Sequence, residues 1–364
     1  METGKGSEEV VRISKESLCN LLKDVFRKLG VPQEECDIVV DTLLEASLAG
    51  YDSHGVMRVP RYVTGLQRGE IRPGAAIKVL KETPACAHVD GGRGLGPVTA
   101  TFGIRLASRK ARRSGIGCVS IVNANDIARL GGYLRAPAEE GLIGMMMVND
   151  AGGGPSVAPW GGVDPLLSTN PIAAGIPRRE GPPIIIDIST SVVAFGKLKM
   201  YANRGRNVPE GWIVDREGSP CTDPNTFFAS PKESALLPLG GALAGHKGFG
   251  LSLLVDVMAG ALSGAGCSTG EEAELEGNGV FIQIIDPMMF GPLGRFEDQI
   301  EGFITMLKGS KKASGVEEIS IPGERAAKER RMREREGIPV DLPTWRQLRD
   351  IMDELGVKAK GIPK

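Results

Sequence analysis

The sequence lacks the short motifs that carry most nucleotide and metal chemistry. It has no G-x-G-x-x-G fingerprint and no G-x-x-x-x-G-K-[ST] phosphate loop, which disfavours a standard Rossmann enzyme and a P-loop NTPase. It also has no G-x-S-x-G elbow, no H-E-x-x-H helix and no Y-x-x-x-K dyad. Hydrolase and zinc-enzyme chemistry therefore lose most of their support.

Paired cysteines, long apolar runs and excess charge are absent as well. The six cysteines are scattered, with no C-x-x-C pair and no histidine at ligand spacing, so we expect reduced thiols, a cytoplasmic protein and no metal site. The longest apolar stretch, residues 251–266, is interrupted by Asp256 and by glycines and falls short of the ~20 residues that span a bilayer. Residues 1–9 are polar and acidic, unlike a signal peptide. The formal net charge is -1, so no long-range field favours nucleic acid or a membrane.

What the chain does contain is the composition of a globular protein. Of its 364 residues, 41% are hydrophobic and 24% are charged, and the length exceeds the ~150 residues expected for one domain. Apolar periodicity predicts helices over residues 14–30 and 32–50, and Asp52 and Ser53 can cap a third. Beyond Pro73, short β-type runs alternate with helical stretches, which indicates a mixed α/β fold.

The elements of the second part follow from the same patterns. The segment 323–337 carries six basic and four acidic residues at helical spacing, which favours a solvated helix face over a nucleic-acid patch. The other predicted elements are strands over 77–80, 85–89, 118–122, 142–148, 184–188 and 280–285, and helices over 97–113, 247–262 and 295–307.

Only three histidines are present, so an imidazole acid or base must be His54, His88 or His246. His88 alternates inside a predicted strand, which favours a structural role. His246 lies in Gly245-His246-Lys247-Gly248, where glycines let the backbone approach a ligand and Lys247 begins a predicted helix whose N-terminus suits a phosphate. A plain helix start is the alternative for this segment.

His54 stands in Asp52-Ser53-His54-Gly55-Val56-Met57-Arg58, which puts a hydroxyl, an imidazole and a guanidinium at a predicted helix start. The Arg58 fork can bind a carboxylate through two parallel hydrogen bonds, and His54 can exchange a proton with the atom that is reduced. A helix cap beside a surface arginine is the structural alternative.

Four motifs in order extend this pattern over the chain. They are the turn just described, Ser168-Thr169-Asn170-Pro171 followed by residues 187–191, residues 245–251 and residues 321–325. Through these motifs, from about residue 10 to 357, the sequence resembles the malate/L-lactate dehydrogenase family of non-Rossmann oxidoreductases. The resemblance implies an α/β fold with an atypical non-Rossmann cofactor-binding domain and a helical domain built from both chain ends.

The resemblance also implies an organisation and partners. Residues 1–85 would begin the helical and substrate domain, residues 86–275 would bind NAD or NADP, and residues 276–364 would return to the first domain. The protein would be a homodimer that transfers hydride between the cofactor and a small 2-keto or 2-hydroxy carboxylate, with no nucleic-acid or membrane partner.

The resemblance carries over site residues in two groups. Ser53, His54 and Arg58 would meet the substrate, with His54 as proton donor and Arg58 on the carboxylate. The nicotinamide cofactor would contact Ile186, Asp187, Ile188, Ser189, Thr190, Ser191, Val192, His246, Lys247, Pro322, Gly323 and Glu324.

One position departs from the family pattern. Similar members commonly read N-x-N-H-[IF]-G-R-L-G, with a second active-site histidine, whereas residues 123–131 read N-A-N-D-I-A-R-L-G. Asp126 therefore stands where the histidine would be, and Ala128 replaces a glycine. An ionised Asp126 within ~4 to 6 Å would stabilise protonated His54 and raise its pKa above the ~6.5 reference.

This departure leaves three functions open. The first is an active hydroxy-acid dehydrogenase in which Arg58 and Arg129 hold the carboxylate. Asp126 could instead stabilise a protonated ring imine in a cyclic imino acid reductase, or mark a catalytically silent cofactor-binding homologue. NAD and NADP also stay open, and a 2′-phosphate could meet Arg93, Arg178, Arg179 or Arg204.

Overall fold

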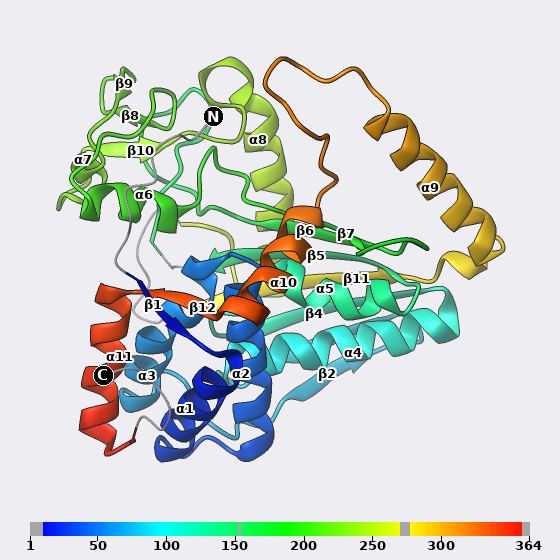
Figure 1. Ribbon diagram of the computed structural model, residues 1–364, viewed down its shortest axis with the longest axis horizontal. Coiled ribbons are helices and arrows are strands. Elements are labelled where there is room, and N and C mark those ends of the chain that lie inside the picture. Colours follow the sequence, from blue (N-terminus) through cyan, green and yellow to red (C-terminus); the bar gives the residue numbers. More distant parts are fainter. Residues whose placement is uncertain (1–9, 152–153, 270–276, 359–364) are drawn as a thin grey trace.

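In the computed structural model, which describes residues 10–151, 154–269 and 277–358, the two ends of the chain fold together into one helical layer (Figure 1). Strand β1 (Val10–Ile13) pairs antiparallel with β12 (Ile338–Asp341), so the first and last parts are joined. The expectation about a signal peptide concerns residues 1–9, which lie outside the described residues.

The helices of this layer show the predicted amphipathic pattern. Ser14 caps α1, because its side chain accepts a hydrogen bond from the backbone N–H of Ser17. Leu22 of α1 packs in the same apolar core as Trp345 and Leu348 near the other chain end. The helices are α1 (Lys15–Lys28), α2 (Gln33–Leu48), α3 (Val59–Gln67), α10 (Glu324–Glu336) and α11 (Leu342–Leu355).

The third helix begins later than predicted. Two short 3-10 turns, η1 (Asp52–His54) and η2 (Val56–Arg58), precede α3, which starts at Val59. Gly55 separates the turns and packs so closely on α2 that an added Cβ would lie 2.0 Å from the Ser47 Oγ. The segment is therefore a tight turn that does not cap a helix.

The second layer is a sheet whose described part has seven strands in the order β2-β3-β4-β11-β5-β6-β7. Strands β3 and β4 are parallel, whereas the other neighbouring pairs are antiparallel. A Rossmann domain requires a largely parallel sheet with a glycine-rich βα turn, so this topology accounts for the missing fingerprint and confirms the expected atypical α/β fold. The strands are β2 (Lys78–Glu82), β3 (Cys86–Asp90), β4 (Ile116–Ala124), β5 (Ile143–Ala151), β6 (Ile172–Ile176), β7 (Ile184–Ile188) and β11 (Gly277–Ile285).

Helices cover both faces of this sheet. In β11, Val280 and Ile282 pack with α4 (Gly96–Ser114) and α5 (Leu130–Glu139), whereas Phe281 points to the other face and packs with Val255 and Ala259. Those two residues belong to α8 (Gly241–Val255) and to the π-helical segment η3 (Asp256–Ala261) that continues it. The helix predicted from Lys247 thus starts at Gly241, with a kink at Ala244, whose φ is -140°.

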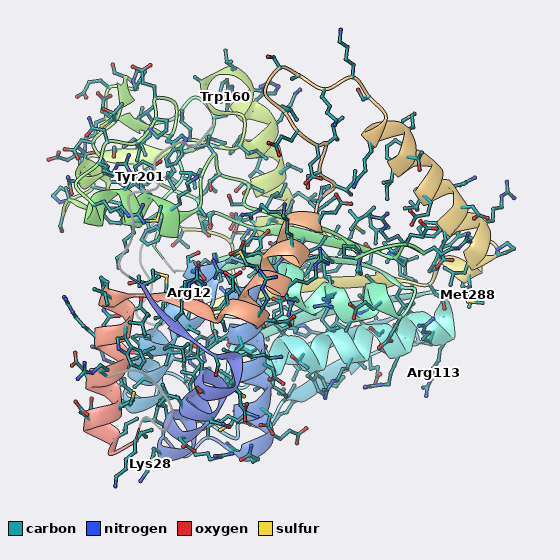
Figure 2. The ribbon with its side chains drawn as sticks, viewed as in Figure 1. Arg12, Lys28, Arg113, Trp160, Tyr201 and Met288 are labelled. Carbon is teal, nitrogen blue, oxygen red and sulfur yellow. The ribbon has the colours of Figure 1, made fainter. Side chains whose placement is uncertain are left out.

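A smaller sheet, ordered β10-β8-β9, completes the molecule together with α6 (Phe195–Asn203) and α7 (Asn225–Phe228). Trp160 and Tyr201, labelled in Figure 2, both lie in this part. Helix α9 (Leu293–Lys308) projects at one side (Figure 1). The small strands are β8 (Ile213–Asp215), β9 (Pro220–Cys221) and β10 (Ser234–Leu236).

Two strands bear on the predicted division of the chain. Strands β2 and β11 come from the segments expected in the helical domain, yet both belong to the large sheet. The domain boundaries themselves stay a prediction. Within the described residues, no helix has the length and apolar character needed to cross a bilayer.

Candidate active site

Residues 53–58, here called the Ser-His-Arg turn, bring a hydroxyl, an imidazole and a guanidinium together. The Ser53 Oγ lies 3.0 Å from His54 Nδ1, and Arg58 Nε donates a hydrogen bond of 2.9 Å to the Ser53 carbonyl. Helix α10 supports the turn, because Arg333 donates to both carboxylate oxygens of Asp52. Ser53 therefore orients both His54 and Arg58, and the Asp52–Arg333 pair fixes the start of the turn.

Asp126 reaches this turn through Arg58. Its Oδ2 lies 3.1 Å from Arg58 Nη1 and 3.8 Å from Arg61 Nη1, while its Oδ1 accepts hydrogen bonds from the Ala128 N–H at 2.9 Å and the Tyr62 hydroxyl at 3.2 Å. Burial raises the pKa of Asp126, but the two guanidinium groups outweigh burial and lower this pKa to about 2. Asp126 is therefore an ionised carboxylate at neutral pH.

The expectation that the pKa of His54 lies above ~6.5 is wrong, because the structure lowers it to about 4. Burial is the largest cause, and the positive charges of Arg58 and Arg129 act in the same direction. Asp126 does raise the pKa of His54, as expected, but it does not outweigh burial and Arg58. His54 is consequently neutral at pH 7, the form that can accept a proton.

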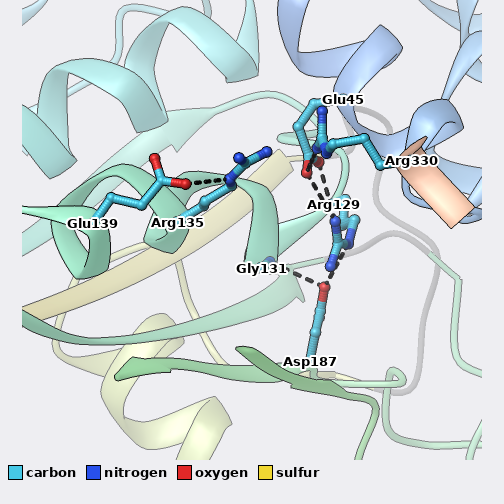
Figure 3. A network of polar contacts seen from close by, with 7 residues as sticks. All are labelled: Glu45, Arg129, Gly131, Arg135, Glu139, Asp187 and Arg330. Carbon is cyan, nitrogen blue, oxygen red and sulfur yellow. Dashed lines mark hydrogen bonds and ion pairs between the residues drawn. The ribbon is translucent and has the colours of Figure 1, made fainter. Parts of the chain in front are cut away.

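Arg129, the second arginine expected at the substrate carboxylate, is buried and paired with two carboxylates of the protein. Only 4% of its side chain is exposed, its Nε lies 3.1 Å from Asp187 Oδ2, and its Nη1 lies 3.1 Å from both carboxylate oxygens of Glu45 (Figure 3). The guanidinium also stacks 3.9 Å from the centre of the Tyr51 ring. Of the two arginines, Arg58 is the accessible one, with 26% of its side chain exposed.

The expected cofactor segment, residues 186–192, leaves the end of β7 and is tied to the start of α8. The Leu239 N–H donates to the Thr190 carbonyl at 2.8 Å, and the Gly248 N–H donates to the Leu239 carbonyl at 3.2 Å. Within this segment, Asp187 Oδ2 lies 3.1 Å from Arg129 Nε. The rest of the segment is held beside the residues expected at the cofactor phosphates.

His246 and Lys247 stand in the first turn after the kink at Ala244, and both side chains are exposed. The Trp160 ring meets His246 edge-on, with ring centroids 5.7 Å apart. An added Cβ on Gly245 would lie 2.7 Å from that indole, which explains the glycine. An exposed ammonium and imidazole at a helix start suit an anionic ligand.

Pro322 and Gly323 lie at the opposite end of β7. The Ile185 N–H donates to the Pro322 carbonyl at 3.1 Å, and Gly323, with φ of +101°, passes so close to Pro183 that an added Cβ would lie 2.8 Å from its carbonyl oxygen. From position 185 to 188, the end of β7, an extended strand covers about 10 Å. The expected cofactor residues are therefore spread along the strand and do not form one cluster.

The Glu324 carboxylate is paired with basic side chains of the protein. Its Oε1 lies 2.7 Å from Lys308 Nζ and 3.5 Å from Arg178 Nη1. Arg178 is also paired with Glu301 at 3.0 Å, and Arg179 with Asp298. These pairs weaken the case for Glu324 as a ligand contact and for Arg178 or Arg179 as contacts of a 2′-phosphate.

Helix α6, which follows the expected cofactor segment, contacts the Ser-His-Arg turn. An added Cβ on Gly196 would lie 2.9 Å from the Ser53 Cβ, so α6 packs directly on the Ser-His-Arg turn. This contact joins two segments that are more than a hundred residues apart in the chain. The helix that follows the expected cofactor segment therefore lies against the turn that holds His54.

Sequence reasoning missed two residues that support the site. Tyr62 is 1% exposed and donates to the Asp126 carbonyl at 2.7 Å, in addition to its carboxylate contact. Its spacing of four residues from Arg58 was the available signal, because it puts both on one helix face. Glu45 gave no such signal, since its partner Arg129 is remote in sequence.

Comparison with known proteins decides the family. The sequence pattern of the family described as malate/L-lactate dehydrogenase matches residues 13–349. The chain belongs to the malate/L-lactate dehydrogenase family. A malate dehydrogenase from Pyrococcus horikoshii is 40% identical over 363 residues, covering 98% of this chain and 99% of that protein. A malate/(S)-sulfolactate dehydrogenase from Methanothermus fervidus is 35% identical over 351 residues, covering 95% of this chain and 98% of that one.

Solved structures agree with this assignment. The malate dehydrogenase structure from Pyrococcus horikoshii has a TM-score of 0.87 at 38% identity and covers 98% of this chain and 99% of its own. A delta1-piperideine-2-carboxylate reductase from Pseudomonas syringae pvar. tomato has a TM-score of 0.80 at 31% identity, covering 93% and 99%. The expectation of an oxidoreductase acting on CH–OH groups is thereby confirmed at the level of the family.

Proposed function

We propose that the chain is an NAD(P)-dependent dehydrogenase that interconverts small 2-hydroxy and 2-keto carboxylates. The observation that carries the proposal is the Ser-His-Arg turn, where Ser53 bonds both to a neutral imidazole and to a partly exposed guanidinium. Relatives that match over nearly their whole length are named for malate and sulfolactate, which are small 2-hydroxy acids.

His54 acts on the substrate oxygen at C2. With a pKa of about 4, it accepts the hydroxyl proton as a general base during oxidation and returns it during reduction. Arg58 depresses this pKa, so a carboxylate that neutralises Arg58 raises the pKa and favours the protonated form. Substrate binding thereby prepares His54 for the reductive direction.

Arg58 holds the substrate carboxylate. Its Nε and Nη1 are fixed by the Ser53 carbonyl and by Asp126, which orients the plane of the guanidinium. A planar fork that is already oriented loses less conformational freedom when it binds a carboxylate. Asp126 therefore serves Arg58 as an orienting partner in this proposal.

The described residues fit a nicotinamide dinucleotide. Exposed His246 and Lys247 at a helix start would hold its phosphates, and Pro322 and Gly323 lie close on the backbone of β7. Ile186, Ile188, Ser189, Thr190, Ser191 and Val192 would form the remaining side. The residues named here would hold the cofactor, whose nicotinamide would supply hydride chemistry at C2 of the substrate.

A cyclic imino acid reductase is the second candidate, because the ionised Asp126 could face a protonated imine and because one solved relative is named for such an activity. The pairing of Asp126 with Arg58 and Arg61 favours the keto acid, since the carboxylate charge is already matched. The intact Ser-His-Arg turn argues against a catalytically silent homologue.

A homodimer also belongs to this proposal. Apolar side chains of α8 and η3 and of the turn that follows are exposed, with 45% for Leu253, 52% for Val257 and 56% for Leu262, as a subunit interface requires. Sedimentation should report about twice the 38.6 kDa chain mass. A fully active monomer would contradict this. The cytoplasmic location stays a prediction from cysteine usage.

A substrate panel tests the activity directly. Malate, lactate and sulfolactate, their keto acids and cyclic imines would be assayed with the oxidised or reduced form of both NAD and NADP. The proposal expects hydroxy and keto acids to outperform imines. Turnover of imines alone would move the assignment to the second candidate, and no turnover with bound cofactor would support a silent homologue.

A further inference from the structure

A buried ion-pair network lies between the helical layer and the cofactor sheet (Figure 3). Arg129 contacts two carboxylates at once, through Nε to Asp187 at 3.1 Å and through Nη1 to Glu45 at 3.1 Å. Arg330 of α10 adds a second cation at 2.5 Å from Glu45. Glu45 and Asp187 thus connect α2, α10 and β7 to the start of α5.

The backbone around Arg129 is shaped for these contacts. Arg129 is the N-cap residue of α5, and the Gly131 N–H donates to Asp187 at 3.0 Å. An added Cβ on Gly131 would lie 2.8 Å from the Asp187 carboxylate, and one on Gly132 would lie 2.6 Å from that of Glu45. The two glycines let both acids reach the start of the helix.

Asp187 and Glu45 are each close in sequence to one part of the proposed site, the cofactor segment or the Ser-His-Arg turn. Asp187 lies in β7 immediately before Ile188, a residue of the expected cofactor segment that is 42% exposed. Glu45 lies in α2, which runs into Tyr51 and the Ser-His-Arg turn, and Arg129 stacks on the Tyr51 ring at 3.9 Å. A shift of Arg129 would therefore move the turn relative to β7.

We propose that Arg129 is a positioning residue that fixes the position of the Ser-His-Arg turn relative to β7. This proposal rests on the proposed function. The guanidinium is suited to the task because its fork binds two carboxylates in fixed directions, which the single ammonium of lysine does not reproduce. The geometry assigns Arg129 no contact with substrate.

Arg129→Lys is the test, since it keeps the charge and removes the fork. We expect kcat to fall about ten- to hundredfold, as for small misplacements of reacting groups. The KM for the keto acid should stay within about twofold, because Arg58 holds the carboxylate. The Kd of NADH or NADPH, measured by fluorescence titration without substrate, should rise several-fold.

Arg135→Lys is the matched control. Arg135 lies in the same helix and pairs with Glu139 at 2.7 Å, but 43% of its side chain is exposed (Figure 3). This variant should match the wild type in kcat, KM and cofactor Kd, because exposed pairs contribute little.

Two results would overturn the proposal. Wild-type kcat and cofactor Kd in Arg129→Lys would leave the network a purely structural role, and a raised KM with unchanged kcat would make Arg129 a carboxylate ligand. If Arg129→Lys does not fold, Glu45→Gln removes one link and must show the same pattern. The turnover of hydroxy acids by the wild-type protein tests the proposed function separately. If the wild-type protein does not turn over hydroxy acids, the cofactor Kd of Arg129→Lys still tests the positioning role.

Discussion

Arg58 and Arg129 both lie near the proposed site, but their surroundings differ. Arg58 has 26% of its side chain exposed and one close carboxylate, Asp126, whereas Arg129 has 4% exposed and two carboxylates, Glu45 and Asp187. Both guanidinium groups use Nε and Nη1 in contacts within the protein, so burial is what closes Arg129 to a ligand and leaves Arg58 open to one. The comparison teaches that exposure of the side chain, and not residue type, separates an arginine that can bind substrate from one that connects two parts of the fold.

The largest effect should come from substitution of His54, the imidazole beside Arg58. His54→Ala is expected to lower kcat by about two to four orders of magnitude, the range for loss of a general acid or base. The Kd of the cofactor should stay near the wild-type value, because His54 lies in the substrate turn. Retention of more than about half of the wild-type turnover would remove His54 from the proton transfer.

A smaller loss is expected at Arg58 itself. Arg58→Lys keeps a positive charge but loses the fixed pair of donors, so KM for the carboxylate substrate should rise about tenfold or more while kcat changes less. Steady-state kinetics at saturating cofactor measures both values. This split is the reverse of that expected for Arg129→Lys. An unchanged KM would place Arg58 outside the substrate site.

The smallest effect concerns the partner of Arg58. Asp126→Asn removes a charge that raises the pKa of His54, so this pKa should fall further below about 4. It should also lower kcat/KM for a cyclic imine about three- to tenfold relative to a keto acid. The ratio of the two kcat/KM values is the measurement. An unchanged ratio would show that Asp126 only orients Arg58.

Local patterns predicted much of the fold. Helix 14–30 and strand 184–188 follow from periodicity and capping, and the structure has both. The third helix was misplaced, because the close contact of Gly55 with Ser47 is tertiary and leaves no local signal. The strand order of the large sheet could not be predicted from local patterns either, because it depends on pairings between strands that are distant in sequence.

The site was predictable as residue types and motifs, but its balance of charge was not. Sequence placed Asp126 near His54 and predicted a raised pKa. The structure adds burial and Arg58, and these reverse the direction. The pairing of Arg129 with Glu45 could not be predicted, because the two residues are remote in sequence. Such pairings decide which groups remain available, and only the packed structure specifies them.

The central claim, that Arg58 binds the substrate carboxylate beside His54, is most directly tested by an NMR titration of the imidazole signals. With three histidines in the chain, the His54 signal can be assigned from its loss in His54→Gln. The account predicts a pKa of about 4 in the free protein and a clear rise when an unreactive carboxylate such as oxamate binds with cofactor. A free-protein pKa near ~6.5 that does not move when the carboxylate binds would contradict the account.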